Sequence, residues 1–252
     1  MAWDPQQYLK FQAERSAPFV DLLQLLQVRK GMHVVDLGCG TGELTARLSD
    51  ALPGSKVLGI DTSPQMLEQA QTWSRPGLRF ERCDLREIGG RWDVIFSHAA
   101  IHWAEDHEKL IPTLWERLAH EGQLAVQIPA NHDHFTHVAI GQLAAEAPFA
   151  EALGGWSREN TVLPVERYAE ILHGCGAESI TAFLKVYPHL LEDADALLEW
   201  TKGTTLVPWL ERLPDEMHEP FLARYRERLR ARFPERPVFY GFKRILFAGR
   251  KP

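Results

Sequence analysis

The chain has 252 residues, of which 45% are hydrophobic, 10% aromatic and 25% charged, and this composition excludes disordered and fibrous classes. No apolar run approaches the roughly 18 residues that cross a bilayer, and the N-terminal segment has no apolar signal region, so we expect no membrane association and no secretory leader. The net charge is −6, but residues 221–252 carry +8 and the rest of the chain −14; this distribution suits nucleic acid poorly, and we expect no such partner.

Helical and strand patterns alternate along the first 130 residues, which is typical of a parallel sheet with helices on both faces. A first helix is predicted over 4–26, with Asp4 as its N-cap and Pro5 at its first position. Short apolar runs predict strands at 33–38, 56–61, 78–84, 92–98 and 123–130. The helices between them are predicted at 43–52, 63–73 and 108–120.

The pattern changes after residue 130. A helix over 164–176 and a strand over 179–187 follow an irregular segment; a helical stretch over 192–233 precedes a last strand over 237–249. The predicted fold is therefore α/β: a doubly wound, Rossmann-like, seven-stranded sheet, mostly parallel with an antiparallel last strand, and a helical cap. The predicted parts are an N-terminal cap segment 1–30, a core 31–130, a cap excursion 131–163, a core helix and strand 164–191, a cap insertion 192–236 and a final strand 237–252.

The most informative motif is the run Val34–Gly42, in which a buried strand leads into a Gly-x-Gly-x-Gly turn and a helix. Glycines there allow a tight turn and a close approach of a ligand to the main chain. Asp61 stands nineteen residues beyond Gly42, at the end of the second strand, where a carboxylate accepts two ribose hydroxyls. The pattern predicts a nucleotide-like cofactor.

Two details favour S-adenosylmethionine over NAD. The spacing is Gly-x-Gly-x-Gly rather than Gly-x-Gly-x-x-Gly, and Asp36 would oppose a pyrophosphate but favour the cationic methionine end, with loop N–H groups meeting its carboxylate. A third acid, Asp84, ends the third strand and suits the adenine amino group. The predicted cofactor is S-adenosylmethionine, and its predicted binding residues are Asp36, Gly38, Cys39, Gly40, Asp61, Thr62, Met66, Asp84, Leu85 and His98.

Several further segments carry a family resemblance. They are Tyr8-Leu9-x-Phe11-x-Ala13-Glu14-Arg15-Ser16, Ala99-x-x-x-Trp103-x-x-Asp106-His107, Leu124-Ala125-Val126-Gln127-x-Pro129 and Phe242-x-Arg244. Across about 30–130 the chain resembles class I S-adenosylmethionine-dependent methyltransferases, and over nearly its whole length it resembles the trans-aconitate 2-methyltransferase family. The resemblance implies methyl transfer to a carboxylate oxygen of a small polycarboxylic acid by a monomeric cytosolic enzyme. The family pattern carries arginines where Ala17 and Val207 stand here.

Methyl transfer to a carboxylate needs no general base, because the acid is ionised at pH 7. The site instead needs cationic side chains that bind and orient the acid and aromatic side chains that exclude water. The predicted catalytic residues are Arg15, Trp103, His102 and Arg244. Each of three residues also has a purely structural interpretation. Arg15 could form a surface ion pair, Trp103 could be buried in the core, and His102 could be packed without a catalytic role. The arginines at 224, 226, 228, 230 and 232 are predicted to form a solvated helix face.

Other functions stay open on the sequence. A metal site at His132, His134 and His137 is not expected, because a loop promises no fixed ligand geometry. A methyltransferase acting on nucleic acid or protein is disfavoured by the turn Ser97-His98-Ala99-Ala100, which lacks the Pro-Pro-aromatic pattern of base-modifying enzymes. A methyltransferase for another small molecule and a non-catalytic S-adenosylmethionine-binding protein remain alternatives. Three dispersed cysteines (Cys39, Cys83 and Cys175) indicate a reducing cytoplasm rather than a disulfide framework.

Overall fold

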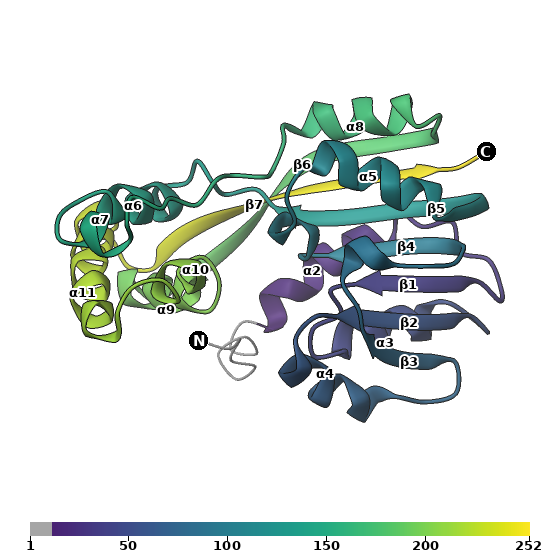
Figure 1. Cartoon of the computed structure of the whole chain (residues 1–252), viewed down its shortest axis with the longest axis horizontal. Helices are drawn as coiled ribbons and strands as arrows, with labels where there is room; N and C mark the ends of the chain where they lie inside the picture. The colour runs from purple at the N-terminus through teal and green to yellow at the C-terminus, as the bar shows by residue number, and fades with distance from the viewer. Residues whose placement is uncertain (1–11) are drawn as a thin grey trace. The chain divides into compact units, whose positions relative to one another are not determined.

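The computed structural model describes residues 12–252, with side chains from Ala17 onward (Figure 1). These residues form two compact units. The helical unit comprises Ala130–Asn160 and Val186–Phe242, and the sheet unit comprises Ala13–Pro129, Thr161–Lys185 and Lys243–Pro252. Within the described residues, no helix has the length and apolar character needed to cross a membrane. The predicted domain boundaries stay a prediction.

The seven strands form one sheet in the order β3-β2-β1-β4-β5-β7-β6. Their bounds are β1 His33–Leu37, β2 Lys56–Asp61, β3 Leu78–Arg82, β4 Trp92–His98, β5 Leu118–Pro129, β6 Glu178–Leu191 and β7 Val238–Arg250. The pairs β1–β2, β1–β4, β2–β3 and β4–β5 are parallel, whereas β5–β7 is antiparallel. The order reverses direction at β1, which is the position where ligands bind in doubly wound sheets. The predicted fold class, including its antiparallel last strand, is confirmed.

Helices cover both faces of the sheet. On one face, Phe19 of α2 (Gln12–Leu23) packs edge-on against Phe96 of β4, and Thr45 of α3 (Glu43–Ala51) reaches Asp36 of β1. On the other face, the Tyr168 ring of α8 (Val165–Gly174) stacks on Phe247 of β7 at a centroid distance of 4.5 Å. This two-sided covering explains why the central strands read as continuous apolar runs. The sheet unit also contains α4 (Pro64–Ala70) and α5 (His107–Glu116).

Two predicted boundaries at one junction are wrong. The helix predicted over 108–120 ends at Glu116, and β5 begins at Leu118 instead of residue 123. Leu118 pairs with Trp92 of β4 and is buried, so a contact across the sheet extends the strand beyond what local propensity indicates. The sequence predicts that the strand begins at residue 123 because Gly122 is the nearest residue that strongly favours the end of a helix. The strand predicted over 179–187 continues to Leu191, and the helical stretch predicted over 192–233 consists of three helices, Ala194–Lys202, Val207–Leu210 and Asp215–Arg232. The remaining elements agree with the predicted bounds to within three residues, and the part of the 4–26 helix before Gln12 lies outside the described residues.

The helical unit has an aromatic core of its own. It contains α6 (Phe135–Ala144), α7 (Phe149–Ala152), α9 (Ala194–Lys202), α10 (Val207–Leu210) and α11 (Asp215–Arg232). Phe149 packs edge-on against Phe221, and Trp209 and Tyr240 are buried in the same cluster. Burial of these rings supplies much of the free energy that holds short helices together.

Candidate functional site

The glycine turn after β1 closes on the end of β2. The N–H groups of Gly38 and Cys39 both donate to the Ile60 carbonyl, at 2.8 and 2.9 Å, and the Gly40 N–H donates to Asp61. Gly38 has φ 72°, and a Cβ at this position would lie 2.3 Å from the Ala100 side chain, so only glycine fits. These N–H groups already have protein acceptors, so the expectation that they meet a ligand carboxylate is not supported. A cationic group suits this turn better.

Asp36 lies directly before the turn and is buried. Its carboxylate accepts a hydrogen bond of 2.6 Å from the Thr45 hydroxyl. Burial raises the pKa of Asp36 to about 7, the Thr45 hydrogen bond opposes that shift, and the nearby charge of Asp61 adds to it. A carboxyl group poised near neutrality is stabilised as an anion when a cation binds beside it. The cationic end of S-adenosylmethionine fits this requirement.

Asp61 fastens two backbone segments at the end of β2. One carboxylate oxygen accepts from Gly40 N at 3.0 Å, and the other accepts from Ser63 N at 2.9 Å. A carboxylate has about four lone-pair positions, so two remain for further donors such as the two hydroxyls of a ribose. Asp61 therefore shapes the glycine turn and fits its predicted role in cofactor binding.

We expect the Asp61→Ala variant to bind S-adenosylmethionine about 5- to 150-fold more weakly, which corresponds to about 1–3 kcal/mol for groups left without their partner. Isothermal titration calorimetry measures this change. Asp93→Ala is the matched control, because Asp93 also accepts a backbone N–H, from His33 at 2.8 Å, but at the opposite end of β1. Equal affinity in the two variants would remove Asp61 from the ribose site.

Asp84 and Leu85 begin a short 3-10 helix (Leu85–Glu87) beyond β3. The Asp84 carboxylate accepts two hydrogen bonds from the Arg86 side chain, at 2.9 and 2.6 Å, which holds the pKa of that acid well below its usual value, at about 2. Asp84 stays ionised and keeps acceptor capacity for an amino group. Met66 is buried in α4, whereas Thr62 is exposed in the preceding bend. Their predicted cofactor contacts stay predictions.

A polar group gathers at the carboxyl ends of β4 and β5. His98 and Gln127 are directly paired in the sheet, and Arg244 of β7 pairs with Pro129, two residues after Gln127. Side chains at paired positions share a face of the sheet, and positions two apart share it as well. Arg244 Nη1 donates to Gln127 Oε1 at 3.2 Å, and Arg244 is only 3% exposed. By the same register, Asp36 lies on this face.

The turn that follows β4 carries His102 and Trp103 in a 3-10 helix (Ile101–Trp103). Their rings lie 4.9 Å apart, and Trp103 is 40% exposed, which excludes its alternative place in the core. Two hydrogen bonds hold the turn: His107 of α5 contacts the Ile101 carbonyl at 2.8 Å, and the Thr161 hydroxyl donates to the His102 carbonyl at 3.2 Å. The turn is thus fixed by the start of the next helix and by one residue, Thr161, that lies far from it in sequence.

His107 belongs to a buried chain of hydrogen bonds whose proton positions follow from the partners. Its Nε2 faces the Ile101 carbonyl and must carry the proton, so its Nδ1 accepts from the Tyr168 hydroxyl at 2.7 Å. That hydroxyl in turn accepts from the Leu163 N–H at 3.0 Å. Burial lowers the pKa of His107, which keeps the ring neutral despite the carboxylate of Asp106 nearby. The network's contribution to stability is therefore complete above the ordinary imidazole pKa of 6.5 and is lost as the pH falls below it.

We expect the Tyr168→Phe variant to be destabilised by about 1–3 kcal/mol, because the buried Nδ1 of His107 and the Leu163 N–H both lose their partner. Urea unfolding at pH 8 measures the change. Tyr187→Phe is a control on a second buried tyrosine. A Tyr168→Phe protein as stable as the wild type would contradict this chain of hydrogen bonds.

Comparison with known proteins decides the family. Residues 34–122 match a family model described as a methyltransferase domain. The chain is 47% identical over 258 residues to a trans-aconitate 2-methyltransferase of Deinococcus radiodurans, a match covering 100% of this chain and 99% of that protein. The chain belongs to the trans-aconitate 2-methyltransferase family. A relative of the same name from Escherichia coli O157:H7 is 34% identical over 254 residues, covering 99% of this chain and 98% of its own.

Solved structures agree on the fold. The YcgJ protein of Bacillus subtilis superposes with a TM-score of 0.59 at 15% identity, covering 94% of this chain and 98% of its own. The cyclopropane synthase MmaA2 of Mycobacterium tuberculosis gives a TM-score of 0.59 at 16% identity, covering 94% and 84%. Members of the trans-aconitate 2-methyltransferase family are S-adenosylmethionine-dependent enzymes, so the predicted enzyme class and methyl donor are confirmed.

The family's N-terminal segment is described only in part. Arg15 lies within α2, four positions before Phe19, but its side chain is outside the described set, as are Tyr8 and Phe11. The predicted role of Arg15 stays a prediction. Ala17 is exposed in α2, and Val207 begins α10 and is half-buried; these are the two positions at which the family pattern carries arginine.

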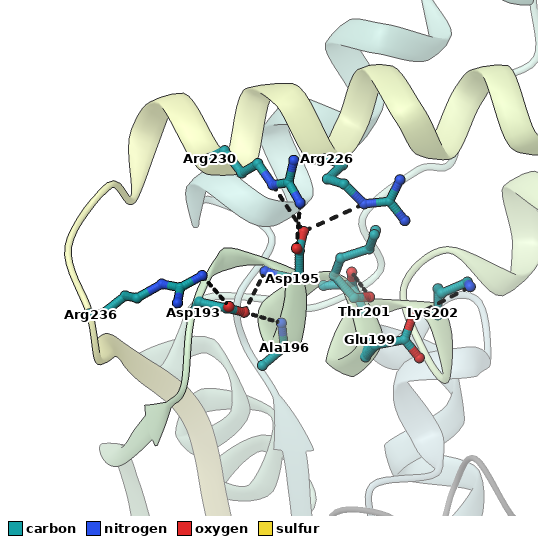
Figure 2. Close-up of polar contacts among 10 residues, drawn as sticks. Asp193, Asp195, Ala196, Glu199, Thr201, Lys202, Arg226, Arg230 and Arg236 are labelled. Atoms are coloured by element: carbon teal, nitrogen blue, oxygen red, sulfur yellow. Dashed lines mark hydrogen bonds and ion pairs between the residues drawn. The ribbon is translucent and has the colours of Figure 1, made fainter.

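Four of the eight arginines in residues 221–252 form ion pairs with acids of the helical unit, and Figure 2 shows three of them. Asp195 contacts both Arg226 and Arg230, and Asp193 accepts from Arg236 at 2.7 Å (Figure 2). Arg228 pairs with Glu146, and the Arg224 guanidinium lies over the Phe149 ring. Exposed ion pairs of this kind contribute little free energy. Arg224, Arg230 and Arg232 are exposed and Arg226 and Arg228 are half-buried, in agreement with the predicted solvated helix face.

Two of the three histidines in the 131–163 segment, His134 and His137, serve local structure. His134 is the N-cap of α6, where its Nδ1 accepts from Thr136 N. His137 lies between the hydroxyls of Thr136 and Thr205, and burial lowers its pKa to about 3, with the positive charge of Arg158 adding to that effect. A neutral imidazole bonded to two hydroxyls is satisfied without a ligand.

Three residues that organise this family site received no predicted role from the sequence: Gln127 and His107, which occur only within the resemblance motifs, and Tyr168. Gln127 had a detectable signal, since it is a polar residue within the apolar run 123–130. The bond between His107 and Tyr168 joins residues 61 positions apart, and no periodic pattern reveals such a pair.

Proposed function

We propose that this protein transfers a methyl group from S-adenosylmethionine to a carboxylate oxygen of trans-aconitate. The observation that carries the proposal is the sharing of one sheet face by Asp36, which suits a cationic donor, and Arg244, which suits an anionic acceptor. The trans-aconitate 2-methyltransferases to which the chain is similar over its full length supply the name of the acid.

The bound donor supplies an electrophilic methyl group on a sulfonium. The residues of the chain bind and orient: Asp36 and Asp61 hold the donor, and Arg244 holds the acid. Trp103 is exposed on the turn after β4 and is suited to exclude water from the reacting atoms. Because the acceptor is already ionised at neutral pH, catalysis reduces to positioning the oxygen about 3 Å from the methyl carbon and in line with the bond that breaks.

The test is methyl transfer from radiolabelled S-adenosylmethionine to a panel of tricarboxylates, dicarboxylates and monocarboxylates, with the ester identified by mass spectrometry. We expect trans-aconitate to give the highest kcat/KM. The dicarboxylates matter because Ala17 and Val207 stand where arginines belong in the family pattern. Donor binding without transfer to any acid would instead support a non-catalytic S-adenosylmethionine-binding protein.

We also propose that the protein acts as a monomer in the cytoplasm and has no nucleic-acid partner. The family resemblance supports the monomer, the cysteine pattern supports the cytoplasm, and the acidic balance outside residues 221–252 supports the absence of a nucleic-acid partner. Analytical ultracentrifugation tests the first of them: a dimer at micromolar concentration would overturn it.

A further inference from the structure

Gln127 has a side chain whose orientation is fixed by its neighbour. Its Oε1 accepts from Arg244 Nη1 at 3.2 Å. A guanidinium has donors only, so the amide oxygen must face Arg244, and a flip of the amide is excluded. The Nε2 of Gln127 therefore points away from the cation.

That Nε2 is buried, and it has no hydrogen-bond partner among the described groups, which are the backbone from Gln12 and the side chains from Ala17 onward. Gln123 in the same strand shows the usual arrangement: its Nε2 donates to the Gln27 carbonyl at 2.9 Å and its Oε1 accepts from Gln27 N at 2.7 Å. Both glutamines are buried, yet only Gln123 has both ends of its amide paired. A buried donor without an acceptor is costly, and in natural proteins such groups mark strained or functional positions.

The position of Gln127 matches the acceptor end of the site. It lies at the carboxyl end of β5, paired with His98 and on the same sheet face as Asp36. Two strand spacings of about 4.8 Å separate β5 from β1, so Gln127 lies roughly 10 Å from the strand that carries the glycine turn. A methyl donor and a small acid placed side by side span such a distance.

The chemistry selects the ligand group. An amide N–H donates only, so its partner is an acceptor, and a buried cation beside it favours an anionic acceptor. A carboxylate meets both conditions. The carboxylate that is methylated loses its charge as the reaction proceeds, so donors that hold its charge would stabilise the ground state more than the transition state. The pair therefore suits a carboxylate that does not react.

We propose that Gln127 is a binding residue for a non-reacting carboxylate of the acid: its Nε2 donates to one oxygen while Arg244 neutralises the charge. This inference rests on the proposed function. Gln127 has no exposed surface, so binding of the acid includes a local movement of the groups that cover its amide. Gln127 thereby selects polycarboxylic acids over acids with one carboxylate.

The test compares the Gln127→Glu and Gln127→Met variants with the wild type, using trans-aconitate and a monocarboxylic acid of the tested panel. We expect KM for trans-aconitate to rise about 10-fold or more, which is the size of effect expected when a buried hydrogen-bond partner is lost. We expect kcat to stay within about threefold of the wild-type value. KM for the monocarboxylic acid and Kd for S-adenosylmethionine stay unchanged. The Glu substitution gives Arg244 a charged partner, so the melting temperature of that variant does not fall below the wild-type value.

Gln123→Met is the matched control, because that substitution breaks two hydrogen bonds in the same strand. We expect it to lower the melting temperature and leave KM for trans-aconitate unchanged. The inference is overturned if either Gln127 variant that folds keeps the wild-type KM, or if both acids lose activity equally. A wild-type enzyme that methylates no acid contradicts the proposed function itself, which distinguishes the two failures.

Discussion

The affinity for S-adenosylmethionine should fall by up to about tenfold for each pH unit below 7. The carboxyl group of Asp36 has a pKa raised to about 7, chiefly by burial, and a bound cation stabilises its ionised form. Binding then releases a proton in acidic solution, and the affinity rises with pH until Asp36 is ionised in the free protein. Isothermal titration calorimetry from pH 5.5 to 8.5, in buffers of different ionisation enthalpy, measures both the slope and the proton release.

The raised pKa of Asp36 also affects the stability of the free protein, which falls with rising pH whereas the affinity for the donor increases. The folded pKa of Asp36 lies above the unfolded value of 3.8, so its contribution to the free protein's stability is complete below 3.8 and is lost as the pH rises through about 7. The thermal stabilisation by a saturating donor should therefore be larger at pH 8 than at pH 6. Asp36→Asn is the control: it should bind the donor weakly and with no slope. A wild-type affinity that is flat across this range would contradict the role of Asp36.

S-adenosylhomocysteine separates the two cationic groups of the donor. It keeps the ammonium group and lacks the sulfonium. Equal pH slopes for the two ligands would place Asp36 beside the ammonium, and a slope for S-adenosylmethionine alone would place it beside the sulfonium.

The cofactor half of the site could be predicted from the sequence because its determinants are local. The turn needs glycine at 38 since the backbone has φ 72° and the Ala100 side chain leaves no room for a Cβ. Each of the acids Asp36, Asp61 and Asp84 lies at or just beyond the carboxyl end of a strand, and parallel strands present those ends at one edge. A strand, a turn and a helix in that order carry enough information to place these groups.

The acceptor half could not be predicted in the same way, because long-range pairing builds it. Arg244 meets Gln127 only through the antiparallel pairing of β7 with β5, and the two residues are 117 positions apart. The start of β5 at Leu118 is set by its pairing with Trp92 in the same manner. Sequence could name Arg244 as a buried cation, but not the amide that fixes its orientation.

Loss of the Arg244 guanidinium should reduce kcat/KM for trans-aconitate by roughly 30- to 5,000-fold, which corresponds to about 2–5 kcal/mol for truncating one member of a desolvated charge pair. The Arg244→Met variant keeps an unbranched apolar stem and removes the guanidinium, that is, its charge together with its N–H donors, including the one that donates to Gln127. The loss should lie mainly in KM, because a carboxylate that does not react is held equally in the ground state and the transition state. Steady-state kinetics with trans-aconitate, and with the analogue in which one carboxylate is a neutral methyl ester, measure this.

Arg250→Met is the matched control for that experiment, because Arg250 lies on the same strand and contacts Glu178 at 2.8 Å in an exposed ion pair. We expect it to leave kcat/KM within about threefold, as exposed ion pairs contribute little. Arg244→Lys should recover part of the lost activity, since an ammonium supplies the charge without the planar guanidinium. If Arg244→Met lowers kcat/KM for the acid and for its neutral ester by the same factor, Arg244 supports the sheet and does not bind the acid. The carboxylate would then be held elsewhere, with Arg15 in α2 as the next residue to test.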